Sequence, residues 1–201
     1  MKLHYREPNN LSELDAIFRL RHAVYSEDGN LNKLLSTSST HDINEFDLNA
    51  LHFAAFDGEN PVAYIRITTD SETHFTDWVK TISANNNITL LKNNVTFPFQ
   101  QYYPNTTWSL SFLDELKGHK IGEVGRLAIH KNYRKGGVIL NELITAFIDY
   151  CKNDQKITTG FGSCTLSLER YYRKFGFSIA QGSEPFVYYG LPEAVIVRFD
   201  R

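Results

Sequence analysis

The chain has 201 residues, of which 42% are hydrophobic and 22% are charged. This is the composition of a globular protein, and it excludes a disordered or a fibrous chain. The formal net charge of −2 gives no overall attraction to nucleic acid or to an anionic membrane, so we expect neither as a partner.

The first third of the sequence predicts a strand, a helix and a hairpin. Residues 2–6 have strand character, and apolar residues then recur at three- and four-residue spacing over LSELDAIFRLRHAVYS, residues 11–26. This spacing predicts a helix with Asn10 or Ser12 as its N-cap. The segment LHFAAFDGENPVAYIRIT predicts two strands, 51–56 and 62–68, around the turn DGENP.

Two polar segments interrupt this pattern. Residues 26–46 are rich in Ser, Thr and Asn and predict a loop with a helical turn at 31–35. Residues 70–120 predict an insertion with a helix around 75–83, irregular structure after it, and partial order over 108–116. The apolar residues of this insertion either line a pocket or pack against the sheet; they are Phe97, Phe99, Tyr102, Tyr103, Trp108, Leu110, Phe112 and Leu113.

The last third alternates between the two kinds of element. It predicts strands at 122–129 and 156–163, each followed by a helix, at about 137–152 and at 166–175. A strand after Gly176 and a closing strand at 194–198 complete the series. This order of elements predicts one domain, residues 1–201, of the α/β (α+β) class, with a mixed sheet and helices on its faces.

Targeting, disulfide and metal signals are not found in the sequence. The N-terminal MKLHYREPNN has no signal-peptide core, and no stretch approaches the roughly 18 apolar residues of a membrane-spanning helix, so we expect a cytoplasmic protein. Cys151 and Cys164 lack CxxC spacing, and we expect both to be buried thiols. No histidine spacing indicates a metal site, so we expect no metal.

The segment YRKGGVI joins the strand at 122–129 to the helix after it. The N-terminus of a helix presents unpaired N–H groups and attracts anions, and the paired glycines Gly136 and Gly137 let a phosphate approach the backbone. With Arg134 and Lys135 beside them, these glycines indicate a phosphate site. The alternative is a glycine-rich turn with solvated cations.

The segment RLAIHKNYRKGGVILNEL resembles the acyl-donor motif Q/R-x-x-G-x-G/A of the GNAT superfamily of N-acyltransferases, with Ile139 in the last position, and ERYYRKFGF resembles the later helix of that superfamily. The resemblance implies a mostly antiparallel central sheet with flanking helices and an insertion between the third and fourth strands. It also implies an acyl-CoA or acyl-phosphopantetheine co-substrate along the fourth strand, held by Leu127, Ala128, Ile129, Arg134, Lys135, Gly136, Gly137 and Val138.

A narrower resemblance is to acyl-homoserine lactone synthases and N-acyl amino acid synthases, a branch of the superfamily that takes acyl groups from acyl carrier protein. EVGRLAI is similar to its E-I-S-R segment, RHAVY to its R-x-x-x-F, NEFD to its D-x-x-D, and YIRIT to a strand of its second hairpin. The chain departs from the branch at Leu31, which stands in place of tryptophan, and at Asn44, which stands in place of aspartate. The carry-over implies an amine acceptor, such as an amino acid or its derivative, bound by Arg21, Tyr25, Asp47, Arg66 and Arg126.

Two residues are candidates for proton transfer. Glu123 lies on an otherwise apolar strand, where an acid must be exposed, paired or functional; we consider it a general base, or else the partner of Arg66 or Arg126 in a structural ion pair. Tyr172 has the position of the superfamily's leaving-group acid, although Tyr171 and Tyr172 are also candidates for aromatic packing at a helix interface.

Several of these residues have a second interpretation. In the alternative interpretation, one ion-pair network supports the loops, with little role in the chemistry; its members are Arg21, Asp47, Arg66 and Arg126. Cys164 has no His and Asp arrangement that would make it a nucleophile, so we expect direct acyl transfer. A basic surface suits either an acyl carrier protein or coenzyme A; its residues are Lys120, Lys131, Arg134 and Lys135. An acetyl-CoA-dependent acetyltransferase and a non-catalytic acyl-thioester-binding protein are the rival functions, and the oligomeric state is open.

Overall fold

The structure is a computed structural model, and it describes residues 2–27, 32, 35, 39–92, 94–188 and 191–200. Leu31 and most of the helical turn expected at 31–35 lie outside the described residues.

The N-terminal elements follow the sequence pattern closely. Strand β1 (His4–Arg6) precedes helix α1 (Leu11–Ser26), and strands β2 (Ala50–Asp57) and β3 (Asn60–Thr68) form the predicted hairpin. The side chain of Asn10 accepts a hydrogen bond from the N–H of Glu13 at 2.9 Å, so Asn10 is the N-cap of α1. A short 3₁₀ helix, η2 (Glu45–Asp47), leads into β2.

The insertion contains two helices separated by irregular chain. Helix α2 (Thr76–Asn85) confirms the helix predicted around 75–83, and α3 (Thr106–Glu115) shows that the stretch 108–116 is mostly helical. Between them the chain makes a 3₁₀ helix, η3 (Pro98–Gln101).

The C-terminal part begins with strand β4 (Ile121–Ile129) and helix α4 (Val138–Asp149), which continues as a π-helical turn over Tyr150–Asp154. Strand β5 (Thr159–Thr165), helix α5 (Leu166–Arg173) and strand β6 (Ser178–Ile179) follow. The strand predicted from residue 156 was placed three residues too early, because the chain turns at Lys156 with a φ of 56°. The sequence pattern also missed strand β7 (Phe186–Tyr188) and shortened strand β8 (Leu191–Asp200).

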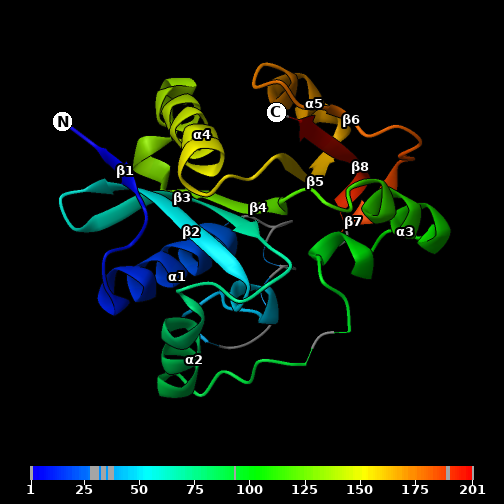
Figure 1. Ribbon diagram of the computed structural model, residues 1–201. Coiled ribbons are helices and arrows are strands. Elements are labelled where there is room, and N and C mark those ends of the chain that lie inside the picture. Colours follow the sequence, from blue (N-terminus) through cyan, green and yellow to red (C-terminus); the bar gives the residue numbers. More distant parts are fainter. Residues whose placement is uncertain are drawn as a thin grey trace.

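The strands of the described residues form one eight-stranded sheet, in the order β1-β2-β3-β4-β5-β8-β6, with β7 paired to β8. Every pair is antiparallel except β4 and β5, which are parallel. Helices α1 and α4 lie on opposite sides of the sheet (Figure 1). The predicted mixed, mostly antiparallel sheet with flanking helices is therefore confirmed.

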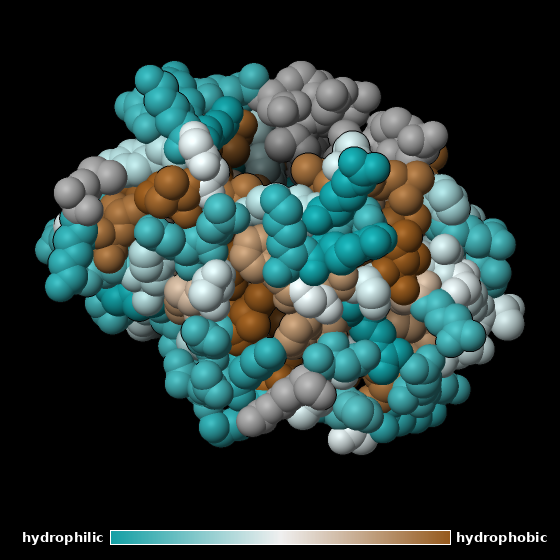
Figure 2. Space-filling model, turned by 90° about the horizontal axis from the view of Figure 1, so that it is seen from above, coloured by the Kyte–Doolittle hydropathy of each residue, from teal (hydrophilic) through white to brown (hydrophobic). Residues whose placement is uncertain are grey.

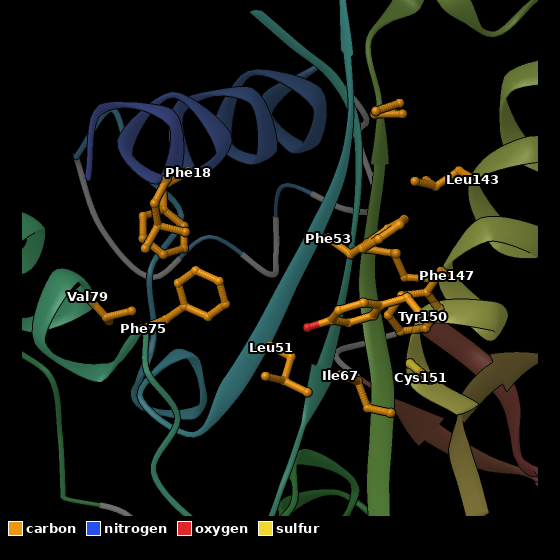
Figure 3. Close-up of a cluster of buried hydrophobic side chains, with 14 of the residues drawn as sticks. Phe18, Leu51, Phe53, Ile67, Phe75, Val79, Leu143, Phe147, Tyr150 and Cys151 are labelled. Carbon is orange, nitrogen blue, oxygen red and sulfur yellow. The ribbon is translucent and has the colours of Figure 1, made fainter. Parts of the chain in front are cut away.

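The hydrophobic core lies on both faces of the hairpin. Phe18, Phe75 and Val79 pack on the side of α1 and α2, while Leu143 and Phe147 of α4 pack on the other side (Figure 3). All five side chains are almost completely buried, and this burial holds the helices against the strands.

The aromatic residues of the insertion form a second core beside β5 and β8. Phe97, Phe99 and Phe112 contact Phe161 of β5 edge to face, with ring centroids 5.1–5.6 Å apart. Tyr103 and Leu116 are buried in the same cluster. Of the two alternatives for these residues, packing against the sheet is the one that the structure shows.

Candidate active site

A notch opens where β4 and β5 separate. The two strands pair only through residues 121–123 of β4 and 159–161 of β5. Beyond this point β4 carries a bulge: Gly125 lies opposite Arg66 and Ala128 lies opposite Tyr64, so β4 has one more residue than β3 over this stretch. Arg126, inside the bulge, has a φ of 55°. Beyond residue 123, no strand among the described residues pairs with the edge of β4 that faces β5.

A cavity of about 160 Å³ occupies this notch. Five of the residues predicted for catalysis and acceptor binding line it: Tyr25, Arg66, Glu123, Arg126 and Tyr172. They come from α1, β3, β4 and α5, so the fold brings together residues that lie far apart in the sequence. Ser163 of β5, Tyr188 of β7 and Pro98 of the insertion also line the cavity, and no sequence pattern indicated them.

Glu123 is a buried acid, and its side chain reaches this cavity. Glu123 is 3% exposed, and its Oε2 atom accepts a hydrogen bond from the N–H of Phe99 at 2.9 Å. Burial raises the pKa of Glu123 to about 8, although the Phe99 N–H and the charge of Arg66 act in the opposite direction. Within the described part of the chain Glu123 makes no ion pair, so the alternative of a structural ion pair with Arg66 or Arg126 is not found.

Beneath the cavity lies a buried network of ion pairs. Arg21 pairs with Asp42 at 2.8 Å and with Asp47 at 2.7 Å, and Asp47 also pairs with Arg66 at 2.8 Å. Arg126 lies 3.5 Å from Asp42. Burial alone would raise the pKa of Asp47, but Arg21 and Arg66 outweigh burial and hold it well below its usual range. The ion pairs of the predicted network are thus present, and Asp42 is a member that the sequence did not indicate.

The two fully buried members, Arg21 and Asp47, do not line the cavity. Asp47 pairs with Arg21 and with Arg66, which does line the cavity, and Asn44 accepts a further hydrogen bond from Arg66 at 3.0 Å. Asn44 therefore uses its amide oxygen at the position where the related branch has an aspartate. A role for Arg21 and Asp47 in acceptor binding would be indirect, through Arg66 and Arg126.

Two tyrosines, Tyr25 of α1 and Tyr172 of α5, line the cavity. Tyr25 donates a hydrogen bond to the carbonyl of Leu127 at 3.2 Å, and burial raises its pKa to about 12. Burial also raises the pKa of Tyr172, so both phenols stay protonated at neutral pH. Tyr171 donates a hydrogen bond to Asn141 of α4 at 2.8 Å, and the ring of Tyr172 packs against Phe177, so both tyrosines also make the interface contacts of the alternative interpretation.

A second cavity, of about 280 Å³, lies along the outer half of β4 at the start of α4. Leu127, Ile129, Arg134 and Gly137 line it, and Leu127 lines the first cavity as well. Gly136 and Gly137 have φ values of 71° and 68°, a conformation that glycine adopts most readily. The strand, the paired glycines and the helix thus form a cleft next to the notch, at the place predicted for the acyl donor.

The other residues predicted to bind the acyl donor differ in their exposure. Ala128 is buried against the hairpin, whereas Lys135 and Val138 are exposed at the start of α4. Arg134 donates to the carbonyl of Ile129 at 2.8 Å, which fixes its side chain beside the cleft.

The cysteines, possible metal ligands and helix lengths of the described residues complete the description. Burial raises the pKa of Cys164 to about 12, so its thiol is not activated as a nucleophile, and Cys151 is likewise a buried thiol. Over the described residues there is no group of three or more His, Cys, Asp or Glu side chains that could hold a metal ion. None of the helices described is long and apolar enough to cross a membrane.

Comparison with solved structures identifies the fold. FeeM, an N-acyl amino acid synthase from uncultured soil microbes, is 16% identical with a TM-score of 0.61, covering 99% of this chain and 91% of FeeM. BjaI, a CoA-dependent acyl-homoserine lactone synthase solved with SAM and isopentyl-CoA, is 17% identical with a TM-score of 0.62, covering 98% and 82%. A GNAT-family acetyltransferase from Streptococcus pneumoniae is 16% identical with a TM-score of 0.50, covering both chains completely. The fold is GNAT-like.

Comparison with curated protein sequences found no match. A model of the family described as N-acyl amino acid synthase FeeM, however, matches residues 16–200, which is nearly the whole chain. The chain therefore belongs to the FeeM family of N-acyl amino acid synthases and is an N-acyltransferase.

Proposed function

We propose that the protein transfers an acyl group from a phosphopantetheine thioester, on acyl carrier protein or coenzyme A, to the amine of an amino acid or its derivative. One observation carries the proposal: Glu123, a buried acid, and Arg66, a buried cation, share a cavity that meets the cleft at the start of α4 through Leu127. Glu123 and Arg66 could thus bind the amine and the carboxylate of one acceptor next to the thioester.

The donor arm would lie along Leu127–Ile129, with its phosphate at the backbone amides of residues 135–138. The N-terminus of α4 and the left-handed glycines suit an anion there. Because no strand of the described chain pairs with this edge of β4 beyond residue 123, the N–H groups of Leu127–Ile129 can also stabilise the oxyanion that forms on the thioester carbonyl.

The acceptor would enter the first cavity. Arg66 lines this cavity, so its guanidinium is the group to which a carboxylate of the acceptor would bind. Arg126 lines the same cavity and adds positive charge. This arrangement directs the amine of an amino acid toward Glu123.

The reaction would then proceed by direct transfer. Glu123 takes a proton from the acceptor amine, directly or through water, as the amine attacks the thioester carbonyl and forms the new C–N bond. The C–S bond breaks, and Tyr172 gives a proton to the departing thiolate. Both proton-transfer groups line the same cavity, and the raised pKa of Glu123 is suited to accepting a proton near neutral pH.

The acyl chain needs an apolar site, and the insertion is a poor candidate for it. None of its eight predicted pocket residues lines the first or the second cavity. A small apolar crevice between the sheet and α4 is a better candidate, because Val124 lines both this crevice and the first cavity. Ile67, Phe147 and Ile148 are among its other walls.

The identity of the carrier depends on the surface around the donor cleft. On the face that carries α4 and α5, hydrophilic side chains surround hydrophobic ones (Figure 2). Lys131, Arg134 and Lys135 are exposed near the start of α4, where Glu27 pairs with Lys131 and Arg134, and Arg170 of α5 and Lys174 directly after α5 are also exposed. A positive surface of this kind suits an acidic carrier protein as well as the phosphates of coenzyme A.

A series of donors with acyl chains of two to sixteen carbons, on both carriers, tests this proposal. Each methylene buried in the crevice would contribute about 0.8 kcal/mol, so we expect the specificity constant to rise with chain length beyond acetyl. The second candidate function is acetyl transfer from acetyl-CoA, which the small crevice volume of about 30 Å³ favours. A maximum at two carbons on coenzyme A would establish that alternative.

A further inference from the structure

We propose that the backbone N–H of Phe99 is a positioning group for Glu123: it holds the carboxyl group in place and favours its charged, proton-accepting form. The proposal rests on the function of Glu123 as the base. It assigns to the insertion a role in the chemistry, in place of the acyl-chain pocket that the sequence suggested.

The contact joins two segments that are distant in the chain. The Phe99 nitrogen lies 2.9 Å from Oε2 of Glu123, across a sequence separation of 24 residues. Among the described residues no other hydrogen bond is made to this carboxyl group. A hydrogen bond from an N–H to a carboxylate is stronger than one to a neutral carboxyl group, so the contact stabilises the charged form.

The turn that presents this N–H is stabilised from within. Pro98 occupies the first position of η3, and Oε1 of Gln100 accepts the N–H groups of Phe97 at 2.9 Å and of Thr96 at 3.1 Å. The carbonyl of Phe99 accepts hydrogen bonds from the two residues after the turn, Tyr102 and Tyr103. The direction of the Phe99 N–H is therefore set before any substrate binds.

The aromatic core anchors the same turn. The Phe99 side chain is fully buried, and its ring meets Phe112 of α3 and Phe161 of β5 edge to face. Phe161 is also the cross-strand neighbour of Glu123. The aromatic cluster of the insertion thus places its N–H donor beside the base.

Several other groups face Glu123 and bear on its titration. Arg66 of β3 favours the charged form, and burial disfavours it. Arg126 of β4, Tyr25 of α1, Tyr172 of α5 and Tyr188 of β7 line the cavity into which the carboxyl group faces. Because burial already raises the pKa of Glu123 to about 8, loss of the Phe99 N–H would leave even less of the charged form at neutral pH.

The test replaces the Phe99 amide by an ester, through incorporation of the α-hydroxy acid 3-phenyllactic acid at this position. The ring is retained and only the N–H is lost. We expect the pKa of Glu123, followed by ¹³C NMR of labelled side-chain carboxyl groups and assigned with Glu123→Gln, to rise by about one unit. The acidic limb of the kcat profile should move by the same amount, so that turnover at pH 7 falls about tenfold and recovers at high pH.

An ester at Tyr102 is the matched control, because it removes an N–H that bonds to the Phe99 carbonyl in the same turn and leaves the contact to Glu123 intact. Gln100→Ala, which removes the acceptor of the Thr96 and Phe97 N–H groups and loosens the turn, should act in the same direction as the Phe99 ester. An unchanged carboxyl pKa in the folded Phe99 ester overturns the inference. A raised carboxyl pKa with an unchanged kcat profile supports the hydrogen bond and refutes the proposed function of Glu123.

Discussion

Replacement of Glu123 by glutamine is expected to lower kcat by about two orders of magnitude or more. Glutamine keeps the shape of the side chain, and its amide oxygen can still accept the Phe99 N–H, but it cannot take a proton from the acceptor amine. Part of the loss should be recovered at higher pH, where more of the acceptor amine is free. Steady-state turnover of the two proteins at several pH values measures the effect.

The stability of the same variant separates catalysis from structure. The pKa of Glu123 is about 8 in the folded protein against 4.5 for the free side chain, so the folded state holds an extra proton between these values. The stability that this proton contributes is complete below pH 4.5 and is lost as the pH rises through 8. Glutamine does not ionise, so it avoids the cost of a buried charge that Glu123 incurs as the pH rises. Glu123→Gln should therefore melt no lower than the parent protein at pH 7, and at a higher temperature than the parent above pH 8. A folded variant with unchanged kcat would contradict the role of Glu123 as the base.

Replacement of Asp47 by asparagine should cause the largest loss of stability among these variants. Asp47 is fully buried between Arg21 and Arg66, and removing its charge leaves Arg66 without an acidic partner among the described residues. Breaking a buried ion pair by removing one partner costs about 3–5 kcal/mol, against a typical domain stability of about 5–15 kcal/mol. Urea unfolding followed by circular dichroism gives the change in the free energy of unfolding.

Asp114→Asn is the control for this experiment. Asp114 pairs with Lys117 at 2.9 Å, but both side chains are mostly exposed, so its loss should change the free energy of unfolding by less than about 1 kcal/mol. Equal effects of the two substitutions would mean that the buried network does not support the fold.

Local patterns predicted the elements whose environment is local. Helix α1 matches its predicted bounds because its apolar spacing and the Asn10 cap both lie within the segment. The hairpin was equally clear, because a turn separates two runs of strand-forming residues. Strand β7 is three residues long and pairs only with β8, so its existence depends on a distant segment and leaves little periodicity in the sequence.

The site shows the same limit. Motif order placed Glu123, Arg66, Arg126, Tyr25 and Tyr172, and the fold brings these residues to one cavity. Whether an arginine faces substrate or lies beneath it depends on packing, which no motif records. Two further partners also depend on packing and carry no sequence signal. Asp42 lies in a loop and pairs with Arg21, and Phe99 contributes a backbone N–H that any residue except proline would provide.

The most direct test of the proposed reaction is the mass of the product formed from a pool of ¹⁵N-labelled amino acids and an acyl donor. Direct transfer predicts an amide product that contains one acyl group and the acceptor's ¹⁵N, together with one equivalent of free thiol. Its formation should depend on the amino acid's carboxylate, because amine analogues without this group cannot bind the guanidinium groups of Arg66 and Arg126 that line the cavity. Release of thiol with free fatty acid and no amide, over all donors and acceptors tried, would contradict the account.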